Sequence, residues 1–391
     1  MIYLSILCIC LLAISYICSN ENIFSPGVLT NSIWLVCIGL WYILPHHLPP
    51  LSSQFITGVS LWISTLTITA LTLQSLNTRS SIANIKPSAL IKDIYFWLSI
   101  ATIPLLISFV YNAITHGSSG NWMYDLRMAA IGENGQEEVY TPFYSILWMG
   151  TYLLYLYDTS KKHWLRTVLL GLMVFGFSFA CMSKIMILNF VVMTLFVLYI
   201  KKIVTTKHIL IVLCVLFIGL ITLQGLRHAI KMDETGIENT LTTYFLSSMS
   251  AFGTVEPNTS AHYAENSFRL IYAIKYKLGL STIKPIETLL PWISKPIPTN
   301  TYTTLYPFYK DFGVWGIGIF AIIAGILYGS IFKQVLKKNH FFILLWAYLC
   351  MVVITQYVAD ALFTNLAGHI KMIMLLYIPF FVSKHHLFEK K

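Results

Sequence analysis

Charged residues are scarce in this chain. Only 11% of its 391 residues are Asp, Glu, Lys or Arg, whereas 57% are hydrophobic. A soluble protein needs far more charge to cover its surface, so this scarcity excludes an ordinary soluble globular fold.

The sequence also lacks the patterns of a disulfide framework, a metal site or a cleaved leader. It has no HExxH motif and no His/Cys cluster with ligand spacing, so we expect no metal and no other cofactor. The first apolar run has no basic segment before it and no small-residue cleavage site, and is therefore expected to be a membrane span. The cysteines all fall in or at the ends of apolar runs, as small buried apolar residues do: Cys8, Cys10, Cys18, Cys37, Cys181, Cys214 and Cys350.

Long apolar runs are what the chain has instead. A helix needs about 20 apolar residues to cross a bilayer, and runs of about this length recur along the whole sequence. They predict an all-α integral membrane protein, a single polytopic domain over residues 1–391, with about eleven transmembrane helices: 2–18, 28–45, 56–76, 93–114, 142–158, 165–182, 185–200, 208–225, 312–332, 340–357 and 366–383.

The basic residues set the expected orientation. With eleven spans, five short connections that each carry three basic residues fall on one side, and short basic loops mark the cytoplasm. We therefore expect a bacterial inner-membrane protein with its N-terminus outside and its C-terminus in the cytoplasm. Membrane topology and contact with anionic lipid explain these charges, so no nucleic-acid binding is expected. The five groups are Arg79/Lys86/Lys92, Lys161/Lys162/Arg166, Lys201/Lys202/Lys207, Lys333/Lys337/Lys338 and Lys384/Lys390/Lys391.

This orientation leaves three segments on the periplasmic face, 46–54, 115–141 and the long region 226–311, and a smaller turn at 358–366. We expect interfacial helices in the long region. Three of the five arginines lie on this face: Arg127, Arg227 and Arg269. An enzyme facing outward has no nucleotide-sugar supply, so its energy must arrive in a membrane-delivered substrate such as a lipid-linked diphosphate sugar. The planar fork of arginine holds phosphate oxygens in pairs and stays charged, which suits that ligand.

One candidate group lies in AENSFRLIYAIKYKLG. If the segment is helical, Glu265, Arg269, Tyr272 and Tyr276 share one face. Two interpretations stay open. The segment is an interfacial amphipathic helix with an ordinary Glu–Arg pair, or Glu265 holds Arg269 and the tyrosines present it to a sugar diphosphate.

Other candidates have similar alternatives. Arg227, Arg127 and Lys184 either contact the substrate diphosphate or simply reach the headgroup layer or a surface carboxylate. Asp311, Glu265 and His262 are the competing candidates for the proton acceptor, although Asp311 at a helix start also interacts favourably with the helix dipole.

The segment NTYTTLYPFYKDFG brings aromatic and hydroxyl groups to the start of a span. Its Asn300, Tyr302 and Tyr309, with Tyr272, are candidates for glycan binding, and a membrane aromatic belt is the alternative. Further along, Ala321, Gly325 and Gly329 are spaced by four, which is typical of close helix packing.

These residues resemble those of bacterial oligosaccharide repeat-unit polymerases, the Wzy-type O-antigen polymerases. The likeness rests on Phe24-Ser25-Pro26, Ser183-Lys184 and Glu265-Asn266-Ser267-Phe268-Arg269. It rests above all on Thr299-Asn300-Thr301-Tyr302-Thr303 followed by Phe308-Tyr309-Lys310-Asp311-Phe312-Gly313 and Gly316. Hydropathy, one long outer loop and basic cytoplasmic turns agree over essentially the whole chain.

The resemblance implies a fold like that of the lipid-dependent class C glycosyltransferases and an inverting, metal-independent reaction. The growing glycan would leave undecaprenyl diphosphate and join the non-reducing end of a new lipid-linked unit. Periplasmic arginines would hold the diphosphate, with Arg269 fitting best, then Arg227 and Arg127. The implied partners are the lipid-linked donor and acceptor, membrane lipids and a chain-length regulator.

Two rival functions remain. An O-antigen ligase uses the same donor, and the segment Asn300–Gly313 favours the polymerase over it. A lipid-oligosaccharide flippase or other transporter would show internal repeats and ionisable groups at mid-membrane. The sequence has no such repeat, and its charges gather at the outer surface.

Overall fold

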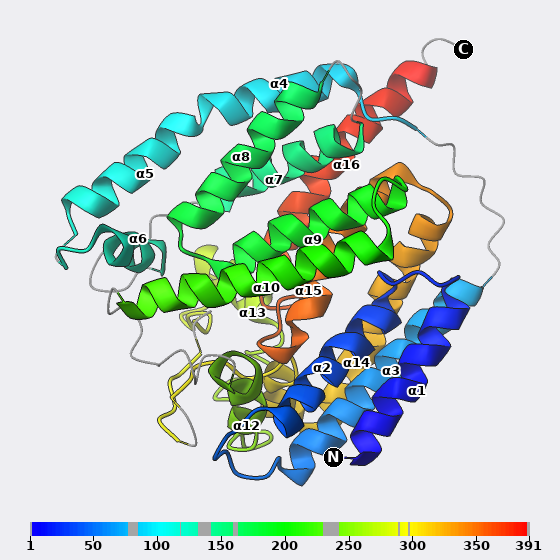
Figure 1. Ribbon diagram of the computed structural model, residues 1–391, viewed down its shortest axis with the longest axis vertical. Coiled ribbons are helices and arrows are strands. Elements are labelled where there is room, and N and C mark those ends of the chain that lie inside the picture. Colours follow the sequence, from blue (N-terminus) through cyan, green and yellow to red (C-terminus); the bar gives the residue numbers. More distant parts are fainter. Residues whose placement is uncertain are drawn as a thin grey trace. The chain divides into compact units, whose positions relative to one another are not determined.

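The computed structural model describes residues 2–76, 85–117, 119–131, 142–158, 163–229, 242–287, 290–295 and 298–388 (Figure 1). Within these ranges the only β structure is an isolated bridge between Ile293 and Thr299. The other regular elements are helices, joined by turns and loops: α1 (Ile2–Cys18), α2 (Pro26–Ile43), α3 (Ser53–Ser75), α4 (Ala89–Ala101), α5 (Ile103–Thr115), α6 (Trp122–Ile131), α7 (Pro142–Tyr157), α8 (Trp164–Ala180), α9 (Lys184–Ile200), α10 (Thr206–Ala229), η1 (Thr242–Leu246), α12 (Ser247–Phe252), α13 (Arg269–Lys277), α14 (Tyr306–Leu336), α15 (His340–Ile354), η2 (Thr355–Tyr357) and α16 (Leu366–Phe388).

Every apolar run of the sequence coincides with helical structure, so the predicted all-helical fold is confirmed. The run 93–114 differs from expectation because it forms two helices, α4 and α5, that are separated at Thr102. Pro104 supplies the reason, since proline has no N–H to donate and its ring clashes with the carbonyl four residues earlier.

Six helical stretches in the described residues are long and apolar enough to cross a membrane, as expected of an all-α membrane protein. They are Pro26–Ile43, Ser53–Ser75, Ala89–Thr115, Tyr306–Leu336, His340–Tyr357 and Leu366–Lys384. Large apolar side chains also lie exposed along the helices; Trp97 is 61% exposed and Leu172 is 63% exposed. Lipid is the natural cover for such surfaces.

The chain divides into two compact units. Unit 1 comprises Met1–Ser80, Ile237–Lys337 and Leu349–Ala367, and unit 2 comprises Ser81–Gly236, Lys338–Tyr348 and Gly368–Lys391. Each unit is built from segments that are far apart in the sequence.

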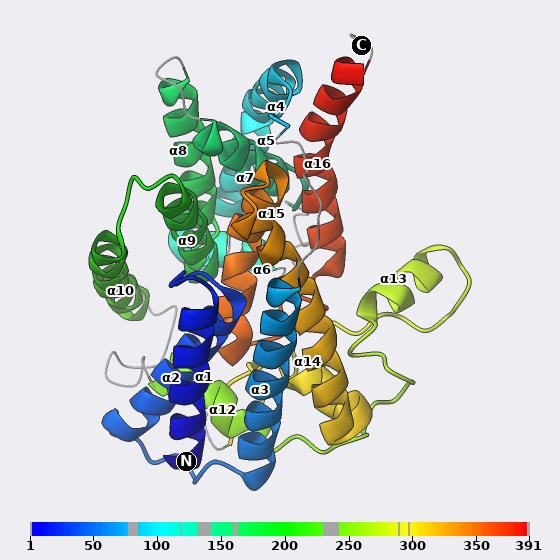
Figure 2. The same ribbon diagram turned by 90° about the vertical axis from the view of Figure 1, so that its right-hand side faces the viewer.

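Unit 1 is organised around two parallel helices, α3 and α14, which lie side by side in Figure 2. A Cβ atom placed on Gly58 would meet Ile317, whereas one on Gly329 would lie 2.7 Å from the Cα atom of Ala70. Contacts therefore advance in the same direction along both helices. The predicted packing role of the small residues is confirmed, because Gly325 and Gly329 let the two backbones touch.

Two of the segments that carry the family resemblance are helix starts. The Ser25 hydroxyl accepts a hydrogen bond from the Val28 N–H at 3.3 Å, and Pro26 occupies the first turn of α2. Ser183 caps α9 in the same way by accepting from the Met186 N–H at 3.4 Å. Capping side chains satisfy N–H groups that have no partner within the helix, so local structure accounts for both segments.

A third segment explains a break in α14. Gly313 has φ +61° and ψ −149°, a conformation essentially reserved for glycine. Three residues later, a Cβ on Gly316 would lie 2.3 Å from the Phe308 carbonyl oxygen. The first part of α14, which includes Phe308 and Phe312, folds back on the membrane-spanning part. Both glycines are needed for this close approach.

In unit 2, α7 packs against α4, α8 and α9. Two ion pairs connect the helices at one end of this group. Lys92 pairs with Asp158, and Arg166 pairs with Asp93 at 2.5 Å while Tyr155 donates to the same carboxylate at 2.8 Å. Lys92 and Arg166, expected only to set topology, therefore also fix the helix ends to one another.

Candidate functional site

The long polar region of unit 1 meets the start of α14 at a carboxylate, Asp311. Its Oδ1 accepts from the Ser260 hydroxyl at 2.5 Å and from the Asn266 side-chain amide at 2.7 Å. Its Oδ2 accepts from the Ser267 N–H at 2.7 Å. Asn266 and Ser267 are buried. The resemblance segments ENSFR and FYKDFG, about 45 residues apart, are thus joined directly.

Aromatic rings pack beneath this junction. The Phe308 ring stacks on Phe320 at 4.3 Å between centroids and on Trp62 of α3 at 5.7 Å. Phe268, which directly precedes α13, lies 5.8 Å from the same Phe320 ring. Because interlocked rings have few alternative arrangements, this cluster fixes where the polar segments leave α14.

The other strong part of the resemblance, NTYTT, is fixed to η2. The Thr304 N–H donates to the Gln356 carbonyl oxygen at 2.8 Å, and the Trp62 indole N–H donates to the Gln356 side-chain oxygen at 3.0 Å. Thr303 and Thr304 are buried. This segment therefore leads rigidly into the first turn of α14.

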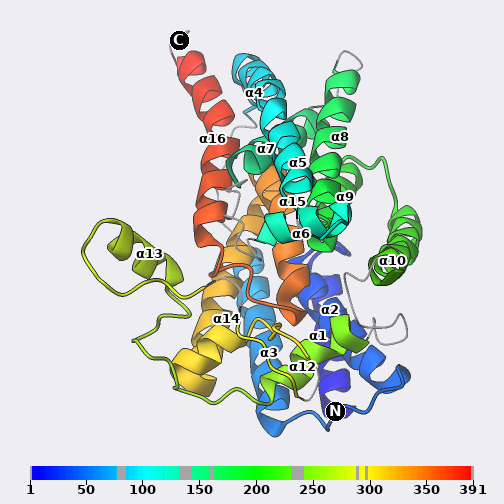
Figure 3. The ribbon, with the colours of Figure 1, turned by 90° about the vertical axis from the view of Figure 1, so that its left-hand side faces the viewer.

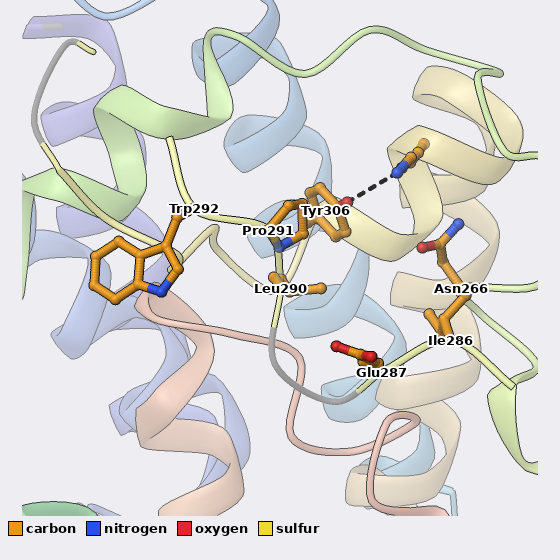
Figure 4. A pocket seen from close by; sticks show the side chains of 8 residues that line it. Asn266, Ile286, Glu287, Leu290, Pro291, Trp292 and Tyr306 are labelled. Carbon is orange, nitrogen blue, oxygen red and sulfur yellow. Dashed lines mark hydrogen bonds between the residues drawn. The ribbon is translucent and has the colours of Figure 1, made fainter. Parts of the chain in front are cut away.

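A cavity of about 360 Å³ opens beside the Asp311 junction (Figure 4). Its polar groups are the Asn266 amide, the Glu287 carboxylate, the Tyr306 hydroxyl and the Lys310 ammonium group, which donates to Tyr306 Oη at 3.0 Å. The remaining wall is apolar and aromatic: Ile286, Leu290, Pro291 and Trp292. This cavity suits a sugar that carries an anionic group, because it combines a cation, an amide, a carboxylate and aromatic surface.

Arg269 lies beside this cavity at the first position of α13. Its Nε donates to the carbonyl oxygen of Ile286, a cavity residue, at 2.8 Å. The predicted shared face is partly wrong, because α13 begins only at Arg269 and Glu265 lies in the turn before it. There Glu265 accepts from the Ala261 N–H at 2.8 Å. Arg269 and Tyr272 do lie on the helix.

Two polar side chains of α13, Arg269 and Tyr272, are half-buried. Tyr272 donates to the Tyr263 carbonyl oxygen at 2.7 Å. Burial first, and then the negative charges of Glu265 and Asp311, raise the pKa of the Tyr272 hydroxyl. His262 is exposed in the turn that precedes the helix.

Two of the tyrosines predicted to bind glycan are buried. Tyr309 is 2% exposed and packs against Phe252 at 5.1 Å between centroids. Tyr302 is 3% exposed and donates to the Pro291 carbonyl oxygen at 3.0 Å, so it supports the cavity wall from behind. Asn300 is half-buried. Both rings thus shape the site as packing groups.

The remaining predicted residues belong to unit 2. The Arg127 guanidinium of α6 reaches the Cys181 carbonyl oxygen at 3.5 Å, at the turn between α8 and α9 where Lys184 begins the second helix. The structure thus brings the Arg127 side chain to the turn that carries Lys184. Arg227 falls in the last turn of α10, and its side chain lies outside the described residues.

Four cavity groups were missed from the sequence: Glu287, Trp292, Tyr306 and Lys310. A signal existed for two of them, because Tyr306 and Lys310 are four residues apart just before the predicted span 312–332 and would face the same way if the helix began earlier, as α14 does at Tyr306. Nothing in the sequence alone indicated that Glu287 and Trp292 would join them. Within the described residues, no three or more His, Cys, Asp or Glu side chains are grouped so as to hold a metal ion.

Asp360, in the turn after η2 of unit 1, is a buried carboxylate. Its oxygens accept from the N–H groups of Leu362, Phe363 and Thr364 at 2.9–3.3 Å. Burial raises the pKa of Asp360 to about 6, although these hydrogen bonds oppose the rise. The turn it holds places Phe363 against Phe308 at 5.3 Å between centroids, so Asp360 supports the site from the other side.

We expect this carboxyl to make the protein's stability depend on pH. The folded protein keeps the proton to a higher pH than the unfolded chain, so stability from this group is full below about pH 4 and is lost as pH rises through about 6. The melting temperature of the wild type, measured against that of Asp360→Asn in the same detergent, should fall over this window. A difference that stays constant from pH 4 to pH 7 would contradict this expectation.

Comparisons of the chain with protein-family models, curated proteins and solved structures give no match.

Proposed function

We propose that this chain is a membrane glycosyltransferase that polymerises lipid-linked oligosaccharide units at the outer face of the bacterial inner membrane. The observation that carries the proposal is the junction at Asp311. Two segments that carry the family resemblance, ENSFR and FYKDFG, meet there, next to a cavity with a cation, an amide and a carboxylate. Six helical stretches long enough to span a bilayer supply the membrane setting that a polyprenyl-linked substrate requires.

In the proposed reaction, a hydroxyl of the acceptor unit attacks the anomeric carbon of the growing glycan. The bond from that carbon to the donor diphosphate breaks, and undecaprenyl diphosphate leaves with the electron pair. Arg269 and Lys310 are the cations placed to stabilise the charge on the leaving diphosphate. Holding donor and acceptor together supplies much of the remaining reduction in barrier.

A proton must leave the attacking hydroxyl. Asp311 is already occupied as an acceptor by Ser260, Asn266 and Ser267, and we assign it to positioning. Glu287 is the carboxylate that lines the cavity itself, and we propose it as the proton acceptor. A positioned base of this kind contributes about 10²–10⁴-fold to a rate.

Arg269→Ala should abolish polymer while the protein still inserts into the membrane. The variant is expressed in a strain deleted for the gene, and the surface glycan is resolved on a gel. Removing one donor that stabilises developing charge typically costs about 10²–10³-fold in rate, which is enough to erase a long-chain ladder. Arg269→Lys keeps the charge but loses the fork, so it should restore only short chains.

The matched control is Lys284→Ala, which removes an exposed cation from the same loop, two residues from Ile286. It should give the wild-type ladder. Normal long-chain polymer from Arg269→Ala at wild-type protein level would refute the role of this arginine.

A further inference from the structure

Helix α13 stands apart from the other helices of its unit, as Figures 2 and 3 show from opposite sides. None of its residues is buried. Its apolar side chains are instead strongly exposed: Ile271 and Ile274 are each 48% exposed, and Leu278, which ends the helix, is 67% exposed. The described part of the chain therefore leaves this face uncovered.

The apolar residues of α13 form one stripe. At 100° per residue, Leu270, Ile271, Ile274 and Leu278 fall on the same side of the helix. Lysines border the stripe on both edges, Lys277 beyond Leu270 and Lys275 beyond Ile271, and both are exposed. A stripe of this width with a lysine along each edge is the pattern of a helix that lies in a membrane interface, where lysines reach anionic phosphates.

The attachment of α13 places it beside the membrane-spanning part of α14. Asp311 is the last charged residue before an apolar stretch that continues to Lys333. Its partner Ser267 is only two residues from the start of α13, a reach of about 7 Å. Phe268 packs on Phe320, which is already within the apolar stretch. A soluble partner could not approach the stripe at this level without displacing lipid.

We propose that α13 lies in the interfacial layer of the bilayer. Its apolar stripe faces the acyl chains, and Lys275 and Lys277 contact the anionic headgroups.

The opposite side of α13 carries Arg269, Tyr272 and Tyr276, which then face away from the acyl chains. Arg269 also donates to Ile286 in the cavity wall. The helix therefore holds Arg269 and the cavity at headgroup level, where the diphosphate of a polyprenyl-linked glycan lies; this step rests on the proposed function.

The test measures depth and needs no activity. A nitroxide side chain is introduced through an unnatural amino acid, one position at a time, so that the seven native cysteines stay in place. The full chain is reconstituted in vesicles of phosphatidylethanolamine and phosphatidylglycerol. Collision rates with oxygen, which partitions into lipid, and with a water-soluble nickel chelate are then compared at Ile271, Ile274, Tyr276 and Leu278.

References for both environments exist in unit 1. Ile322 of α14 is 44% exposed within the apolar stretch and reports lipid, whereas Thr282 is exposed in the polar loop and reports water. We expect oxygen to dominate at Ile271, Ile274 and Leu278, as at Ile322, and the nickel chelate to dominate at Tyr276, as at Thr282.

Two results would overturn the inference. Equal, water-like collision rates at all four α13 positions would place the helix in the aqueous phase. Low collision rates with both reagents at Ile274 and Leu278 would mean that protein, such as a second copy of the chain, covers the stripe. Because neither reading depends on glycan synthesis, an interfacial α13 in a chain that makes no polymer would refute the proposed function alone.

Discussion

Replacing Asp311 with alanine is expected to release the region 260–267 from α14 and to abolish polymer. The substitution removes the acceptor for Ser267 N–H and for the Asn266 amide, both buried. Each buried donor that loses its partner costs about 1–3 kcal/mol, so the loss of both strongly disfavours the present position of this segment. Arg269, two residues beyond Ser267, would lose its position beside the cavity.

Hydrogen exchange distinguishes this positioning role from a role as proton acceptor. If Asp311 positions the loop, exchange over residues 260–277 rises in Asp311→Ala as polymer disappears. If it takes the proton, polymer disappears with exchange unchanged, which would contradict our assignment. Asp311→Asn keeps Oδ1 as an acceptor but turns an amide toward the Ser267 N–H, so we expect a partial effect. Glu256→Ala removes an exposed carboxylate of the same loop and should behave as wild type.

The second large effect is expected at the contact between α3 and α14. A Cβ at position 329 would lie 2.7 Å from the Ala70 Cα atom and 2.8 Å from its carbonyl oxygen. Backbone atoms cannot move aside as a flexible side chain can, so Gly329→Ala forces the helices apart. Overpacking of this kind costs about 1–3 kcal/mol, and we expect Gly329→Leu to prevent accumulation of folded protein.

Gly318→Ala is the matched control on the same helix. Its Cβ would meet only the end of the Leu61 side chain, at 3.4 Å, and alanine favours the helix over glycine. Melting temperatures in detergent should therefore be lower for Gly329→Ala than for wild type and unchanged or higher for Gly318→Ala. Equal values for the two variants would show that the backbones do not touch at Gly329.

The fold was largely predictable because a membrane helix appears in the sequence as a long run of apolar residues. Each apolar run became helix, and the spacing of Gly325 and Gly329 indicated close packing that the structure confirms. The division of the run 93–114 was missed although Pro104 marks it. The number of spans that cross the bilayer stays a prediction, because several helices, such as α1 and α9, are shorter than a typical span.

The site was less predictable because its contacts are distant in sequence. Local spacing suggested a Glu265–Arg269 pair on one helix, but the helix begins at Arg269, which reaches Ile286. Asp311 was proposed as a base or a helix-start residue, and its partners at 260–267 could not be inferred from periodicity. Tyr309 was expected to meet glycan, yet it fills the core beside Phe252.

The central claim is that this chain polymerises lipid-linked units, and one measurement tests it most directly. The gene is deleted in its host and the surface glycan is resolved on a gel. We predict a single repeat unit on each lipid acceptor, because flipping and ligation continue without polymerisation. Polymer accumulating on its polyprenyl carrier in the periplasm would contradict the claim and indicate a ligase, and single units trapped on the cytoplasmic side would contradict it and indicate a flippase.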